Sequence, residues 1–318
     1  MYNGILQIFP KDIRPLFEKA LLVGKCLNEI RLRADKPILI IEGEREWFLT
    51  GHGELTEVSA YARFLTAEEL EKILQHLCHY SLYAFEEEIK QGYITIAGGH
   101  RVGMVGQVVS EDKGKVRTIK YIRGINIRIA HEVKGAAEKL LPFLYENQRP
   151  RSILIVSPPG GGKTTLLRDV VRSFSDGTIY GKGVNVGVVD ERSEIAGCYM
   201  GQPQNDVGIR TDVLDACPKV VGMMMLLRSM SPKVIAIDEL GDEEELQMVH
   251  QIASCGSKVV ATMHGEGLGD LKKRKWMDVI VRERLFEVLL ILKKEGSRCM
   301  IEQIYEITDG GETVCRKG

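Results

Sequence analysis

The sequence predicts an α/β fold with a parallel sheet in the second part of the chain, preceded by a smaller α+β domain. Strand-like apolar runs alternate with helical stretches after residue 145, whereas short strands, a capped helix and a glycine hairpin come before it. A length of 318 residues with 44% hydrophobic content suits two domains with separate cores. The segment 141–152, with Pro142 and Pro150, suits a connection. We therefore assign residues 1–145 to an N-terminal α+β domain and residues 146–318 to the α/β domain.

Local patterns in the first domain predict both helix and strand. Thr66 and Glu69 form a capping box, and apolar residues follow at helical spacing from Leu70. Gly98 and Gly99 lie between two apolar runs and predict a hairpin, because glycine reaches the positive φ of a tight turn. The expected strands are 37–41, 46–49, 93–97, 102–109 and 116–128.

Continuous apolar runs characterise the second domain. Strands that are apolar at every position are typical of a parallel sheet covered by helices on both faces. The expected strands are 153–156, 184–189, 234–237 and 258–261.

Charge and cysteine content narrow the class of protein. The 43 Lys+Arg are balanced by 44 Asp+Glu, which argues against a nucleic-acid binder that relies on bulk positive charge. The seven cysteines are scattered without a CxxC pair, which indicates reduced thiols rather than disulfides or a zinc site. Because we find neither a signal peptide nor a stretch near the roughly 18 apolar residues of a membrane helix, we expect a cytoplasmic protein that reaches any membrane through partners.

Residues 157–165 follow a buried strand and open a helix, as a Walker A phosphate loop does. Glycines let backbone N–H groups approach phosphates, and the helix N-terminus adds partial positive charge. We expect Lys163 to reach the β- and γ-phosphates of ATP and the Thr164 hydroxyl to ligate Mg²⁺. The expected nucleotide-binding residues are Ser157, Pro158, Pro159, Gly160, Gly161, Gly162, Lys163, Thr164 and Thr165.

Ser157 departs from the strict motif, which begins with glycine. Serine fits this position where its φ is ordinary. A glycine-rich turn with a surface lysine would give similar letters, but the flanking strand and helix favour a nucleotide site.

Three further strands end in residues suited to phosphoryl transfer. Ligands gather at the carboxyl ends of parallel strands, so we expect Asp238 to hold the Mg²⁺ shell and Glu239 to polarise the attacking water. Glu191, after Asp190, is a second candidate for water activation. His264 is a candidate sensor of the γ-phosphate. Each of these residues alone has an ordinary explanation, as part of a solvated loop, a helix N-terminus or a structural histidine. Their occurrence together at the ends of neighbouring strands favours a functional site.

Arginines supplied by a neighbouring subunit can stabilise transition-state charge, although surface ion pairs are the commoner role. The candidates are Arg101, Arg123 and Arg128 of the first domain, together with Arg210 and Arg228, for which a direct phosphate contact is the alternative.

Longer strings point to a family. The chain resembles the stage III sporulation protein AA family of spore-forming Firmicutes over nearly its whole length. The strings that carry the resemblance are Glu29–Arg33, Tyr83–Glu88, Gly92–Gly103, Pro158–Leu167, Asp190–Gly197, Arg210–Asp215 and Ile237–Gly241.

This family is similar to the traffic ATPases of type II and type IV secretion systems. The resemblance implies a RecA-like P-loop ATPase core after an N-terminal domain, a homo-hexameric ring, and ATP with Mg²⁺. It matches Asp190-Glu191 to an acidic box and His264 to a histidine box, so Glu191 and Glu239 both remain candidates for the catalytic base. It also implies a mother-cell location, peripheral at the membrane, where the motor powers a channel complex joining mother cell and forespore. The implied partners are the membrane proteins of the stage III A complex.

Two other functions fit parts of the sequence. A nucleic-acid-binding RecA-like ATPase would use a basic module, for which the run Lys272–Lys275 is the candidate, although a solvated helix face explains it as well. A scaffold that binds ATP without turnover would account for Ser157. Phosphate release and single-strand binding separate these functions from a motor.

Overall fold

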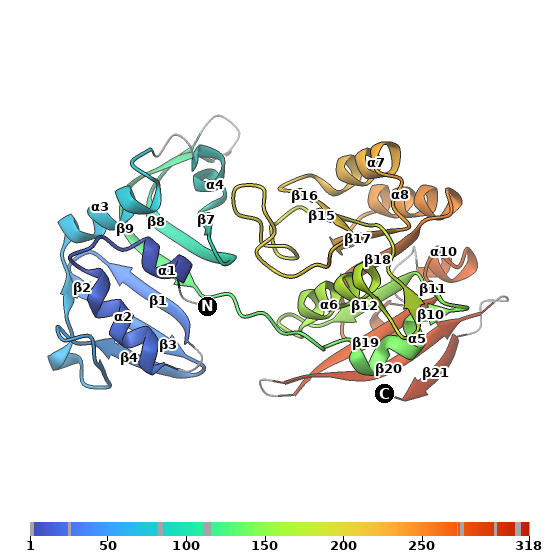
Figure 1. Cartoon of the computed structure of the whole chain (residues 1–318), viewed down its shortest axis with the longest axis horizontal. Helices are drawn as coiled ribbons and strands as arrows, with labels where there is room; N and C mark the ends of the chain where they lie inside the picture. Colours follow the sequence, from blue (N-terminus) through green and yellow to red (C-terminus); the bar gives the residue numbers. More distant parts are fainter. Residues whose placement is uncertain are drawn as a thin grey trace. The chain divides into compact units, whose positions relative to one another are not determined.

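The computed structural model describes residues 3–24, 27–81, 85–110, 116–271, 273, 277–295, 298–308 and 313–317. Most of the basic run at 272–275 and residues 83–84 of the family strings lie outside these residues. The chain forms two compact units, drawn together in Figure 1: Met1–His131 with Gly197–Gln204, and Glu132–Ala196 with Asn205–Gly318. The boundary expected at 145/146 falls inside the second unit. There Pro142 lies in the first turn of a short helix, and the Ala137 N–H donates to Asp169 Oδ2 over 2.8 Å.

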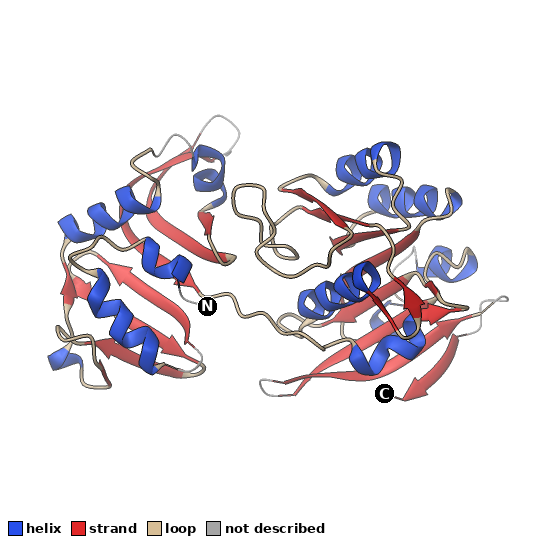
Figure 2. Ribbon diagram, in the orientation of Figure 1, coloured by secondary structure: helices blue, strands red, loops and turns tan. Residues whose placement is uncertain are grey.

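The first unit is an antiparallel sheet of seven strands in the order β5-β4-β3-β1-β9-β8-β7, with helices packed on its core (Figure 2). Its helices are α1 (Asn3–Gln7), α2 (Arg14–Val23), α3 (Ala67–Leu77) and α4 (Glu86–Gln91), with a 3-10 turn at Ser59–Tyr61. Its strands are β1 (Leu27–Arg33), β2 (Lys36–Pro37), β3 (Leu39–Glu42), β4 (Arg45–Leu49), β5 (Leu55–Thr56), β6 (Phe64–Leu65), β7 (Tyr93–Ile96), β8 (His100–Ser110) and β9 (Val116–Arg128).

The two local signals in this unit are confirmed. Thr66 Oγ1 accepts the Glu69 N–H over 3.1 Å while Glu69 Oε2 accepts the Thr66 N–H over 3.0 Å, which completes the capping box of α3. Gly98 and Gly99 adopt φ of 89° and 72° between the antiparallel strands β7 and β8. Their positive φ values are the ones the predicted tight turn requires.

The second unit is built on a sheet of eight strands in the order β16-β15-β17-β18-β12-β19-β20-β21. All pairs from β16 to β19 are parallel, and β20 and β21 add antiparallel strands at one edge. The strands are β10 (Tyr145–Glu146), β11 (Arg149–Pro150), β12 (Ile153–Ser157), β13 (Gly177–Thr178), β14 (Gly181–Lys182), β15 (Val186–Asp190), β16 (Thr211–Asp215), β17 (Val234–Glu239), β18 (Lys258–His264), β19 (Val288–Glu295), β20 (Arg298–Ile307) and β21 (Thr313–Lys317). The helices are α5 (Leu141–Leu144), α6 (Lys163–Asp176), α7 (Lys219–Ser229), α8 (Glu243–Ser254), α9 (Leu268–Leu271) and α10 (Met277–Arg282), with a 3-10 turn at Glu138–Leu140.

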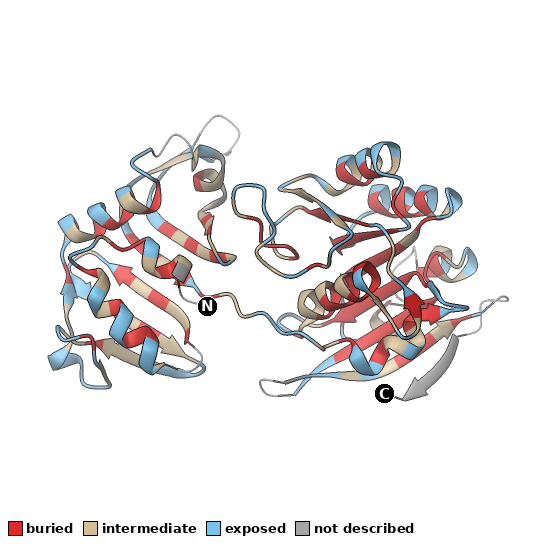
Figure 3. Cartoon of the chain, viewed as in Figure 1, coloured by how far each residue is buried: buried red, intermediate tan, exposed pale blue. Residues whose placement is uncertain are grey.

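Helices cover both faces of this sheet. Leu154 and Val156 of β12 share a core with α7, α8 and α10, while α6 packs across β12, β15, β17 and β18. Every residue of β12 and β15 is buried, and Figure 3 shows burial running along the central strands. A sheet buried on both faces needs strands that are apolar throughout, which confirms the prediction of a covered parallel sheet.

None of the helices built from described residues is long and apolar enough to cross a membrane. The cysteines whose side chains are described carry free thiols: Cys78, Cys198, Cys217, Cys255 and Cys299.

Candidate nucleotide site

The phosphate loop connects the end of β12 to the first residue of α6, Lys163. Gly160 and Gly162 adopt φ of 66° and 78°, a left-handed conformation that residues with a side chain rarely take. Gly161 is required for a different reason, since a Cβ there would stand 2.1 Å from Ser157 Oγ. The three glycines therefore keep the loop backbone free of side chains, as a phosphate cradle requires.

Ser157 is compatible with this loop. It ends β12 without a positive φ, it is fully buried, and its hydroxyl donates to the Pro158 carbonyl over 2.9 Å. Its polar side chain is satisfied locally, so glycine is not needed at this position.

Lys163 forms an ion pair with Glu239. Lys163 Nζ lies 2.9 Å from Glu239 Oε2, and the side chains are 16% and 40% exposed. The hydrogen bond from Lys163 lowers the pKa of Glu239, and the charge of His264 lowers it further. The lysine expected on the phosphates and the glutamate expected on the water thus meet at the carboxyl end of the sheet.

Asp238 is a buried carboxyl in an acidic setting. Burial raises its pKa to about 6, and the charges of Glu194 and Asp190 add to this effect. Thr262 Oγ1 lies 3.4 Å from Asp238 Oδ1. Thr164, half-buried in the first turn of α6, supplies a hydroxyl. One carboxylate and one hydroxyl beside a phosphate cradle are the donors Mg²⁺ takes when phosphates and water complete its shell, so these residues fit the expected cofactor.

The two adjacent acids at the end of β15, Asp190 and Glu191, have different surroundings in the structure. Asp190 is fully buried and accepts the backbone N–H groups of Glu194, Ile195 and Ala196 over 2.7–3.0 Å. Arg168 of α6 donates to the Glu194 and Ile195 carbonyls. Asp190 therefore holds the turn in shape, a role that its position in the sequence did not reveal.

Glu191, by contrast, keeps a side chain that is 38% exposed. Its Oε2 lies 3.8 Å from Lys219 Nζ, which also donates to the Glu239 carbonyl over 2.5 Å. Lys219 therefore lies between the Glu191 carboxylate, which follows β15, and the backbone at the end of β17. The sequence did not identify Lys219 as a candidate. A lysine at the first position of a helix is unfavourable because of the helix dipole, so its presence there could have indicated a specific role.

His264 ends β18 and pairs in register with Ser157, the first residue of the phosphate loop. Its effect on the pKa of Glu239 places it within electrostatic reach of that carboxylate. The structure therefore collects the predicted loop, acids and histidine at one edge of the sheet.

Four of the five arginine candidates have partners within the chain, and Arg228 lies in the last turn of α7. Arg210 donates to the Ser175 carbonyl over 2.8 Å, and Arg101 lies over the Tyr93 ring at 4.6 Å. Arg123 and Arg128 approach Asp35 and Glu29 at 3.2 and 3.6 Å.

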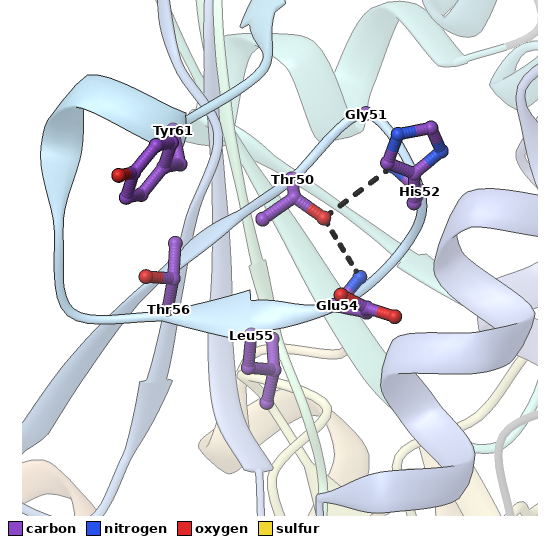
Figure 4. Close-up of a pocket in the computed structure, with 7 residues that line it drawn as sticks. All are labelled: Thr50, Gly51, His52, Glu54, Leu55, Thr56 and Tyr61. Atoms are coloured by element: carbon purple, nitrogen blue, oxygen red, sulfur yellow. Dashed lines mark hydrogen bonds between the residues drawn. The ribbon is translucent and has the colours of Figure 1, made fainter.

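A pocket of about 530 Å³ lies in the first unit, along the loop from Thr50 to Thr56 and beside Tyr61 (Figure 4). Thr50 Oγ1 accepts the N–H groups of His52 and Glu54, and the Glu54 carboxylate pairs with Lys19. These polar groups stabilise the loop itself, and the pocket contains no residue of the phosphate-loop site.

Solved structures share this architecture. The ATPase DotB of Legionella pneumophila superposes with a TM-score of 0.61 at 14% identity, covering 94% of this chain and 82% of DotB. The pilus retraction motor PilT with bound ADP gives a TM-score of 0.61 at 15% identity, covering 96% and 84%. At such low identity the likeness concerns the fold alone. It confirms the predicted fold class, a RecA-like P-loop core that follows an N-terminal α+β domain in the sequence.

Sequence relatives are more specific. Stage III sporulation protein AA of Bacillus subtilis (strain 168) is 42% identical over 305 residues, 96% of this chain and 95% of that protein. The uncharacterized protein ycf45 of Porphyra purpurea is 32% identical over 154 residues, 48% of this chain and 26% of that protein. The profile described as "Sporulation stage III, protein AA" matches residues 2–313. The chain therefore belongs to the sporulation stage III protein AA family.

Proposed function

We propose that the chain hydrolyses ATP at this site and works as a ring-forming motor of the secretion-ATPase type. The observation that carries the proposal is the ion pair of Lys163 with Glu239, 2.9 Å apart beside the glycine loop. It joins the two side chains that phosphate binding and water activation need.

Five side chains of the site have roles in the proposed hydrolysis. Phosphate oxygens compete with Glu239 for Lys163, so binding of ATP frees the Glu239 carboxylate to polarise a water. Glu191 adds a second carboxylate through Lys219. Mg²⁺ held by Thr164 and Asp238 would neutralise charge on the β- and γ-phosphates. Asp190 and Arg168 keep the acidic turn in place.

The biological role rests on family membership. We propose that the motor powers a complex joining mother cell and forespore, in the mother-cell cytoplasm and docked at the membrane on proteins of the stage III A complex. DotB and PilT, whose names describe an ATPase and a retraction motor, share the fold. A homo-hexamer suits such a motor, with arginines of one subunit near the nucleotide of the next.

Phosphate release with and without the membrane partners in liposomes tests the activity and the partnership together. We expect turnover that the partners increase and that Lys163→Ala abolishes, while Lys182→Ala, an exposed lysine of the same unit, leaves it unchanged. Absence of turnover under both conditions would contradict ATP hydrolysis.

The ring is tested by light scattering on Glu239→Gln with ATP. We expect nucleotide-dependent growth from monomer to hexamer. A particle that stays monomeric at all protein concentrations, together with undiminished turnover of the unmodified chain, would remove the ring from the proposal.

A further inference from the structure

Lys219 stands where a cation is locally unfavourable. It is the first residue of α7, and the first turn of that helix carries no acid to offset the helix dipole. Its side chain is only 13% exposed. Such a placement needs anionic partners elsewhere in the fold. α7 packs against β15, which ends just before Glu191, and against β17, which ends in Glu239 (Figure 1).

Those partners come from three elements. Lys219 Nζ lies 2.5 Å from Glu245 Oε1 of α8, 2.5 Å from the Glu239 carbonyl oxygen and 3.8 Å from Glu191 Oε2. Glu245 is itself buried, and its second oxygen accepts the Gly241 N–H over 2.7 Å. Lys219 and Glu245 together therefore hold the turn that follows Glu239. The ammonium group of Lys219 also faces the Glu191 carboxylate.

We propose that Lys219 is a positioning residue for ATP hydrolysis, which holds the Glu191 carboxylate at the carboxyl end of β17 beside Glu239. The inference rests on the proposed function. It assigns the two lysines of the site different tasks. Lys163 exchanges its contact with Glu239 for the phosphates when ATP binds. Lys219 keeps its contacts with a backbone carbonyl and a buried carboxylate, and so fixes the position of Glu191 relative to Glu239.

The test measures kcat, KM and nucleotide affinity of purified full-length variants. Lys219→Met should lower kcat by about 100-fold, the scale of a catalytic group displaced by about 1 Å. Because the proposed role of Lys219 does not include phosphate binding, KM and the affinity for a fluorescent ATP analogue should stay within roughly threefold of the values of the unmodified chain. Lys219→Arg, which keeps the charge, should restore part of kcat.

Lys219→Met leaves the buried Glu245 carboxylate without its partner, which is destabilising. The double variant Lys219→Met/Glu245→Gln removes both charges and keeps the measurement valid if the single variant does not fold. Glu245→Gln alone is the comparison variant. It perturbs the same buried pair but retains Lys219 and a side-chain oxygen that can accept the Gly241 N–H, so it should lower kcat less than Lys219→Met does.

Coupling to Glu191 separates positioning from a purely structural role. In a Glu191→Gln background, Lys219→Met should cause no further loss of kcat, whereas independent structural damage would multiply the losses. The proposal is overturned if Lys219→Met/Glu245→Gln keeps wild-type kcat. It is also overturned if Lys219→Met lowers kcat as much in the Glu191→Gln background as in the unmodified chain. Failure of the unmodified chain to release phosphate overturns the proposed function, and this inference with it.

Discussion

The Lys163 ammonium and the Glu239 carboxylate form an ion pair between the first residue of α6 and the last residue of β17, 2.9 Å apart. The same contact that lowers the pKa of Glu239 also competes with the phosphates for Lys163. Removing the carboxylate charge should therefore affect binding and turnover in opposite directions.

We expect Glu239→Gln to hold ATP at least as tightly as the unmodified chain, since Lys163 is released, and to lower kcat by roughly 10²–10⁴-fold, the usual contribution of a general base. Nucleotide titration and phosphate release on the same sample measure both effects. A Glu239→Gln chain with normal kcat would leave Glu191 as the water-activating residue.

Asp190 should matter for stability more than its neighbour Glu191. Asp190→Ala leaves the N–H groups of Glu194, Ile195 and Ala196 without their acceptor, and the last two of these are buried. Unsatisfied buried donors cost about 1–3 kcal/mol each before relaxation, so we expect a loss of roughly 3 kcal/mol in the free energy of unfolding. Asp212→Ala, an exposed acid on β16, is the matched control.

Thermal unfolding and hydrogen exchange over 190–196 measure the Asp190 effect. We expect faster exchange in that segment for Asp190→Ala alone. An Asp190→Ala chain that unfolds like the Asp212→Ala control would show that the turn has other support.

Much of the core of the second unit was predictable because β12, β15, β17 and β18 contain continuous apolar runs. β19 was not predicted, although its first five residues are apolar and buried. β1, a strand central to the first sheet, was not predicted, although Ile30 to Arg33 alternate as a half-buried strand does. The polar pair Asn28 and Glu29 interrupts the alternation where the register with β3 shifts. β16 was missed for a related reason. It is an edge strand, only partly buried, and its sequence is mainly polar.

The site was predictable as a set of residue types at strand ends, not as a set of roles. Asp190 and Glu191 are adjacent acids, and only the fold shows that one is buried under three backbone N–H groups while the other stays accessible. Lys219 lies far from Glu191 in sequence and reaches it only through the packing of α7.

The capping box of α3 supplies a pH-dependent prediction. Burial raises the pKa of Glu69, but hydrogen bonds from Arg63 and the Thr66 N–H outweigh it, so the net pKa lies below the ordinary value of 4.5. A lowered pKa means that the carboxylate stabilises the folded chain above about pH 4.5, and that this stability is lost as the pH falls through the folded-state value.

We therefore expect Glu69→Gln to destabilise α3 at neutral pH and the difference from the unmodified chain to shrink as the pH falls below about 4.5. Hydrogen exchange of residues 67–77 follows the helix directly. Glu68→Gln, an exposed acid of the same turn, is the control. A Glu69→Gln effect that is independent of pH would assign the loss to packing instead of charge.

Ser157 and Gly161 supply the final prediction, because a Cβ on Gly161 would lie 2.1 Å from Ser157 Oγ. Gly161→Ala should displace the loop and abolish nucleotide binding, whereas Ser157→Gly should retain both binding and turnover, since the serine hydroxyl only satisfies the Pro158 carbonyl. The double variant Ser157→Gly/Gly161→Ala should recover part of the binding, because removing the hydroxyl removes the nearest clash, although the Pro158 carbonyl at 3.0 Å still crowds the site. Titration with a fluorescent ATP analogue measures all three variants. A Ser157→Gly chain that gains turnover would mean that the serine restrains the motor, and a Gly161→Ala chain that binds normally would exclude the cradle described for this loop.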